Sequence, residues 1–80
     1  MNILNMNIKA KISFKYSKEE EAKLSLKSLK PDNLGFINSY QVNNCYICNL
    51  NSDSLRTILA TIDDLLFGEM IVEKVMALKE

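Results

Sequence analysis

Hydrophobic and polar residues alternate strictly over residues 7–16, near the start of the chain. One side of this segment is apolar or aromatic, with Ile8, Ala10, Ile12, Phe14 and Tyr16, and the other carries Lys9, Lys11 and Lys15. A period of two with β-branched and aromatic residues predicts a β-strand that is buried on one face. The other face would present a row of lysines to solvent.

A helical period follows this strand. Ser17 and Glu20 have the spacing of a capping box, which predicts a helix with Ser17 as its N-cap that runs to about Lys30. Its apolar stripe is Ala22, Leu26 and Leu29. Pro31 is expected to end the helix, within a turn over residues 31–33. Leu24 lies off the stripe, so it is either tolerated there or available to a neighbouring subunit.

Two short apolar segments, 36–42 and 45–50, are separated by Asn43 and Asn44. Asparagine tolerates the positive φ that a two-residue hairpin turn requires, so we predict two antiparallel strands. We expect Tyr40 and Tyr46 to lie in the core.

Both faces of this predicted hairpin carry some apolar surface. Ile37 and Ile47 lie on the face opposite the one we assign to the core residues. We therefore expect the sheet to be covered on part of its second side.

A long apolar helix is predicted at the end of the chain, capped by Ser52 or Asp53. Fifteen of the 25 residues from Ser54 to Leu78 are apolar, which is more than one helix face holds. The first stripe consists of Leu55, Ile58, Leu59, Ile62, Leu65 and Leu66. Beyond Gly68 the apolar positions move around the helix, so the helix either breaks there or docks two faces on different partners. A chain with only two helices has too few elements to cover such a helix, and we favour an interaction surface over complete burial.

The order of predicted elements is β-α-β-β-α. With consecutive antiparallel strands, this indicates an α+β fold: a two-layer sandwich in which two helices cover one face of a three-stranded antiparallel sheet. We expect one domain over residues 7–80 after a flexible segment, residues 1–6. A domain of 80 residues is marginally stable on its own, which favours association with a partner.

Charge is balanced overall and unevenly distributed. Ten basic and ten acidic residues give a net charge of zero, which lacks the strong basic excess of many nucleic-acid-binding domains and makes association easier. Residues 1–40 carry seven basic and four acidic residues, whereas residues 41–80 carry three and six. Lys9, Lys11 and Lys15 are therefore candidate RNA contacts, although lysine on a strand face is also a common guard against aggregation.

Catalytic and metal-binding patterns are missing from the sequence. There is no histidine, and Cys45 and Cys48 fall within a predicted strand, so their side chains would point to opposite faces as small packing residues. Asp63 and Asp64 diverge on a helix, as do the glutamates at 19–21, so neither group forms a facing acid–base pair. We expect no enzyme, no metal, no cofactor and no small-molecule ligand. The chain lacks a signal-peptide or membrane-spanning pattern, which predicts a cytoplasmic protein without a membrane partner.

Several segments resemble a known family. They are IKAKISF (8–14), SKEEEA (17–22), SLKPDN (28–33), SLR (54–56), IDDL (62–65) and VEKV (72–75). Together they resemble the small non-catalytic subunit of the KEOPS (EKC) complex, a family related to the CTAG antigens, over about residues 7–78. The segment 67–69 departs from the family pattern.

The resemblance implies a non-enzymatic homodimer that binds the catalytic ATPase-fold subunit of KEOPS. It supports the formation of threonylcarbamoyladenosine in tRNA and helps to hold tRNA within the complex. We expect the catalytic subunit to contact Leu24, Leu55, Ile58, Ile62 and Leu65. Pairing of family members through their sheets implies a dimer interface with Ile37 and Ile47. The alternatives are a stand-alone RNA-binding module and a divergent paralogue with other partners.

Overall fold

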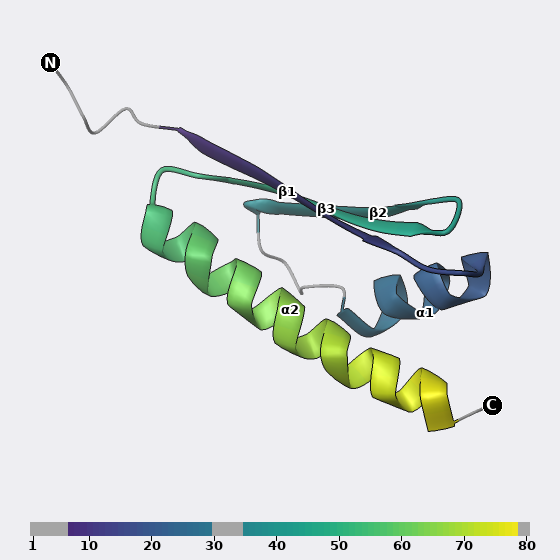
Figure 1. Ribbon diagram of the computed structural model, residues 1–80. Coiled ribbons are helices and arrows are strands. Elements are labelled where there is room, and N and C mark those ends of the chain that lie inside the picture. Colours follow the sequence, from purple (N-terminus) through teal and green to yellow (C-terminus); the bar gives the residue numbers. More distant parts are fainter. Residues whose placement is uncertain (1–6, 30–34, 79–80) are drawn as a thin grey trace, which may run out of the picture.

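The computed structural model describes residues 7–29 and 35–78. In chain order they form β1 (Ile8–Lys15), α1 (Glu19–Leu29), β2 (Ile37–Val42), β3 (Cys45–Ser52) and α2 (Leu55–Leu78). The sheet has the order β1-β3-β2 with both pairs antiparallel, and the two helices lie on one side of it (Figure 1). The predicted α+β sandwich is therefore confirmed. The expected flexible segment 1–6 and the turn at 31–33 fall outside the described residues.

The register of β3, the central strand, defines the two faces of the sheet. Phe14 pairs with Tyr46 and their rings stack at 5.9 Å, on the face that the helices cover. The core on this face consists of Tyr46, Cys48, Leu50, Ile58 and Leu65. The flanking residues of β1, α1 and α2 pack around it, as the strict alternation of β1 and the apolar stripe of α1 predict.

The hairpin between β2 and β3 has the predicted two-residue turn. Asn43 adopts a φ of 53°, a conformation that asparagine tolerates better than most residues. The register that follows pairs Tyr40 with Ile47 and Ile37 with Leu50. Since Leu50 faces the helices and Ile47 does not, Tyr40 lies on the outer face of the sheet. The expectation that Tyr40 belongs to the core is wrong, whereas Tyr46 is fully buried.

Both helix caps differ from the predicted ones. The carboxylate of Glu21, not Glu20, accepts hydrogen bonds from the backbone N–H groups of Ser17 (3.2 Å) and Lys18 (3.1 Å) at the start of α1. At the start of α2, Ser54 is the N-cap, because its Oγ accepts the N–H of Thr57 at 3.2 Å. The observed capping residues lie one or two positions from the predicted ones. Several polar residues at these helix starts can serve as caps, so the sequence alone does not single out one of them.

α2 is continuous through Gly68, so the alternative of a broken helix is excluded. A Cβ atom at Gly68 would lie 2.8 Å from Cδ2 of Leu29, so the glycine allows α1 and α2 to approach closely. Glu69, which follows, occupies the buried face of α2 and is 5% exposed. Among the described helices, none is both long and apolar enough to cross a membrane.

Candidate protein-interaction surface

Exposed hydrophobic side chains gather on one element. Of the nine large hydrophobic residues that are exposed in the described chain, eight lie on α2. They range from 43% exposed at Val75 to 85% at Leu78. A soluble monomer rarely concentrates this much apolar surface on a single helix, which points to an interaction surface.

The helical pitch places six of these eight residues in two groups on opposite flanks of the buried face; Phe67 and Leu78 belong to neither group. One group faces away from α1, and we call it the flank stripe: Leu55, Leu59, Leu66 and Met70. The other group, Ile71 and Val75, turns toward α1, because successive residues rotate by about 100°. The excess of apolar residues thus serves two separate surfaces.

A groove runs between the two helices and has a volume of about 360 Å³. We call it the interhelical groove; its lining is almost entirely apolar and consists of Leu24, Ser28, Leu29, Gly68, Ile71, Val72 and Val75. Its shape depends on Gly68, since a larger residue there would push against Leu29. A groove of this kind can receive apolar side chains from a partner helix.

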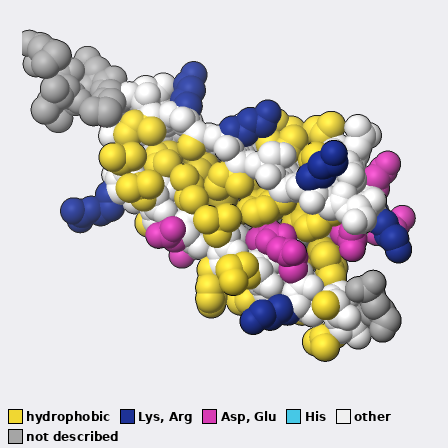
Figure 2. Space-filling view, viewed as in Figure 1, with side chains coloured by type: hydrophobic (Ala, Val, Ile, Leu, Met, Phe, Trp, Pro, Cys, Tyr) yellow, Lys and Arg dark blue, Asp and Glu magenta, His cyan; other side chains and the backbone are white. Residues whose placement is uncertain are grey.

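The flank stripe lies next to an open edge of the sheet. β1 is an edge strand, because its one described neighbour in the sheet order is β3. α2 packs beneath β1 and β3, whereas α1 packs beneath β3 and β2. Figure 2 shows hydrophobic side chains forming a broad patch over the first half of α2 and the adjoining sheet. The free backbone of β1 and the apolar stripe are therefore presented side by side.

The expected partner contacts are divided between the surface and the core. Leu55 is 57% exposed and Leu24 lines the interhelical groove, so both are accessible. Ile62 is half-buried against the core. Ile58 and Leu65 are 2% and 5% exposed and belong to the core, so the expectation that they contact a partner is corrected. The apolar stripe predicted from the sequence contains residues of both the buried face and the exposed flank of α2. The helical period shows which residues lie near one another on the helix, but it does not show which of them face the sheet.

The two expected dimer residues lie on opposite faces of the sheet. Ile37 packs against the core on the helix side, which corrects its assignment to the outer face. Ile47 does lie on the outer face, beside Ser13 and Tyr40, but only 8% of it is exposed. Neither of the two residues therefore offers much apolar surface for a face-to-face contact between two sheets.

A buried polar network joins β1, α1 and α2. The hydroxyl of Ser25 donates a hydrogen bond to the Tyr16 hydroxyl at 2.7 Å, and Tyr16 donates to Oε2 of Glu69 at 2.7 Å. Burial, together with the neighbouring carboxylate of Glu73, raises the pKa of Glu69 above its ordinary value. Burial likewise raises the pKa of Tyr16. The network thereby links the end of β1 to both helices.

The potential metal ligands and the two cysteines do not gather into one site in the described part of the chain. The described residues contain no cluster of three or more potential metal ligands. Both cysteines are free: Cys48 lies in the core, where burial raises the pKa of its thiol, and Cys45 lies on the opposite face. Their side chains do point to opposite faces, as the strand assignment predicts.

The outer face of the sheet carries the predicted lysine row. Lys9, Lys11 and Lys15 are all exposed on this face, which the helices leave uncovered. Pairing with β3 brings asparagines, and through β2 also Tyr40, alongside the lysines. The sequence does not reveal these neighbours, because they belong to strands that are distant in the chain.

Comparisons with known proteins identify the fold. No protein-family model matches the chain, and no curated protein matches it. Among solved structures, the chain is similar to a chain in the crystal structure of the binary complex Gon7-Pcc1, with a TM-score of 0.73. The sequences are 18% identical, and the match covers 96% of this chain and 99% of that chain. At this identity, the likeness establishes a shared fold over nearly the whole chain.

Proposed function

We propose that this chain is a non-enzymatic scaffold subunit of a KEOPS-type complex. In this role it forms a homodimer, binds the catalytic ATPase-fold subunit through its helices and helps to hold tRNA during threonylcarbamoyladenosine formation. Two independent lines support the proposal. The sequence segments resemble the small KEOPS subunit family, and the fold is shared with a chain crystallised in a binary protein complex.

The observation that carries the proposal is the interhelical groove. It is apolar and open, and it is bordered by Leu24, by Ile71 (49% exposed) and by Val75 (43% exposed). These side chains are exposed to water in the isolated chain. A partner that covers them would bury apolar surface, and this burial would stabilise the complex. We assign this groove to the catalytic subunit, because an apolar groove between two helices can accept the apolar face of a partner helix.

The homodimer is assigned to the other flank of α2. A second copy would pair along the free edge of β1 and cover the flank stripe with its own, giving an isologous interface around a two-fold axis. A net charge of zero permits this association. The outer sheet face is a poorer dimer surface, because Ile47 is almost buried and β1 carries three lysines on the same face.

A capture experiment tests the catalytic-subunit contact. Ile71→Asp and Val75→Asp each place a charge in the interhelical groove at a position that is exposed in the folded chain. We expect either substitution to abolish co-purification of the ATPase-fold subunit while the circular dichroism spectrum and cooperative unfolding are retained.

Phe67→Asp is the matched control. Phe67 is 67% exposed on the same helix but lines neither the groove nor the flank stripe, so we expect full capture. Unimpaired capture by both groove variants would contradict the proposed contact. Capture of a different protein from the native host, lost in the groove variants, would instead identify a divergent paralogue with another partner.

A further inference from the structure

We infer that the outer face of the sheet is a binding surface for single-stranded RNA, with lysines for the phosphates and an aromatic ring for the bases. This surface is formed by all three strands and lies opposite the helices (Figure 1). It is separate from the interhelical groove and the flank stripe, and it shares only β1 with the proposed homodimer interface. The inference deepens the RNA-related part of the proposed function, but its test does not depend on the catalytic subunit.

The outer face of the sheet is positively charged. None of the three strands contains an acidic residue, so Lys9, Lys11 and Lys15 form an uncompensated positive row on the outer face. The helices carry seven of the acidic residues, on the opposite layer. A molecule with zero net charge therefore presents one positive face, which is complementary to a polyanion.

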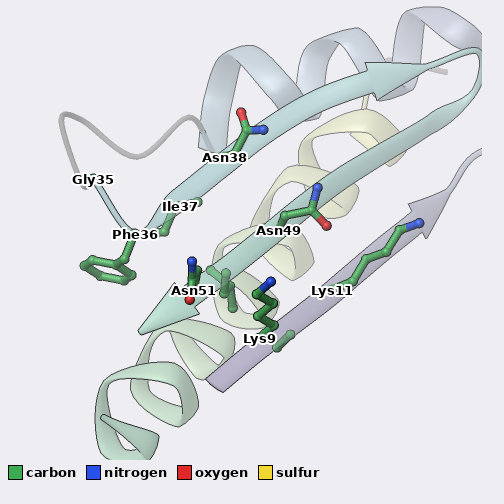
Figure 3. Close-up of a pocket in the computed structure, with 10 residues that line it drawn as sticks. Lys9, Lys11, Gly35, Phe36, Ile37, Asn38, Asn49 and Asn51 are labelled. Carbon is green, nitrogen blue, oxygen red and sulfur yellow. The ribbon is translucent and has the colours of Figure 1, made fainter. Parts of the chain in front are cut away.

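A cavity on this face has a volume of about 520 Å³ and is lined by lysine, asparagine and aromatic side chains, among others. Figure 3 shows Phe36 next to β2 and Lys9 and Lys11 on β1, with Asn49 and Asn51 on the central strand between them and Asn38 on β2. Asparagine is disfavoured in strands, so its repeated occurrence here is not explained by sheet formation.

Strand register aligns these groups across the sheet. Lys9 pairs with Asn51, and the N–H of Asn51 donates to the carbonyl of Phe36 at 2.9 Å, so these three residues form one row. Lys11 pairs with Asn49, which pairs with Asn38, in the next row. The two lysines are two residues apart on one strand, a separation of about 7 Å that is comparable to the spacing of phosphates in an extended strand. Each row thus offers a cation at one side and an amide that can hydrogen-bond a base edge.

The arrangement favours single-stranded RNA over a second copy of the chain or a duplex. Two copies meeting through this face would bring six lysines together, and their mutual repulsion opposes such a contact. An unpaired base, by contrast, can stack on the half-buried ring of Phe36 while its phosphates contact Lys9 and Lys11. Stacking requires bases that are not already paired.

The first test measures binding of a fluorescein-labelled single-stranded RNA of about 12 nucleotides to the full chain by fluorescence anisotropy. We expect Lys9→Glu/Lys11→Glu to weaken binding at least about tenfold at low salt and to reduce the slope of log affinity against log salt by about 1.4. The matched control is Lys23→Glu/Lys27→Glu, which makes the same charge change at exposed positions of α1. We expect the control to bind within about twofold of the parent chain.

The second test addresses stacking. The chain contains no tryptophan, so Phe36→Trp provides a single fluorophore whose emission we expect RNA to quench. Phe36→Leu should weaken binding at least about fivefold, whereas Phe67→Leu on α2 should leave it unchanged.

Three outcomes would overturn the inference. The first is that the parent chain does not bind the RNA measurably at low salt, and the second is that both lysine-pair variants weaken RNA binding equally. The third is that the Lys9/Lys11 variant changes the oligomeric mass of the chain but not its affinity for RNA. The last outcome would assign the face to a second copy of the chain. The capture experiment with the ATPase-fold subunit is a separate readout, because its groove variants leave the outer face intact.

Discussion

Single residues of this chain are informative where they break the local pattern. Glu69 is a charged residue on the buried face of α2, and Tyr16 lies at the end of an otherwise apolar strand face. Each is explained by the other, because Tyr16 donates a hydrogen bond to the Glu69 carboxylate and accepts one from Ser25. Buried polar groups persist when they are paired in this way.

Glu69 makes stability depend on pH. Its pKa in the folded chain is raised, mainly by burial and further by Glu73, so the folded state favours the protonated form. The resulting contribution to stability is complete below the unfolded pKa of about 4.3 and is lost as the pH rises through the folded value. We expect Glu69→Gln, which has no carboxylate to ionise, to remove this decline in the free energy of unfolding.

Urea denaturation at a series of pH values above about 4 provides the measurement. Glu20→Gln, at an exposed position of α1, is the control and should retain the decline of the parent chain. A pH profile that is the same in Glu69→Gln and the parent would contradict this role of Glu69.

At the scale of the element, α2 is a helix with three functions distributed around its axis. One face packs on the sheet through Ile58 and Leu65, one lines the interhelical groove and one forms the flank stripe. Gly68 permits the close approach to α1 that the groove requires. This division explains why the helix is apolar beyond the needs of a single buried face.

The phase of α2 can be tested at two adjacent leucines. Leu65 is 5% exposed and Leu66 is 44% exposed. We expect Leu65→Ala to lower the free energy of unfolding by about 2–5 kcal/mol, because it leaves a cavity in the core. Leu66→Ala should cost less than about 1 kcal/mol in the monomer.

Chemical denaturation at a low protein concentration measures both substitutions. Each variant removes the same atoms from the same helix, so each is the control of the other. Equal destabilisation by the two substitutions would mean that the helix is rotated from the orientation described.

At the scale of the whole molecule, charge and apolar surface are segregated. The lysine row lies on one side of the sheet, the acidic residues lie mainly on the helices, and eight of the nine exposed large hydrophobic side chains in the described residues lie on α2. In the proposed homodimer, pairing of β1 with β1 would bring the lysine rows of two copies beside each other. Self-association and RNA binding then respond to salt in opposite directions.

We therefore expect the dimer to tighten when salt is raised from about 50 mM to about 500 mM, because the repulsion between lysines is screened. Light scattering at several protein concentrations measures this equilibrium. Leu59→Asp/Leu66→Asp should yield a monomer, whereas Ala60→Asp, an exposed position on another side of α2, should not. A parent chain that remains monomeric at all salt concentrations would exclude the proposed dimer.

The sequence by itself determined the elements and their order. Strict alternation defined β1, the asparagine pair defined the hairpin turn, and the wide apolar distribution of α2 indicated an interaction surface. Such features follow from contacts and backbone preferences within a few residues along the chain, which a sequence displays directly. They were sufficient to predict the α+β sandwich.

Only the tertiary structure decided which side of each element faces the core. It placed Tyr40 outside and Ile37 inside, assigned Ile58 and Leu65 to the core, and paired Tyr16 with Glu69. The physical reason is that these outcomes depend on strand register and on the position of α2 relative to the sheet. Both are set by contacts between residues far apart in sequence. A period of 2 or 3.6 residues describes one element at a time, so it carries no information about these contacts.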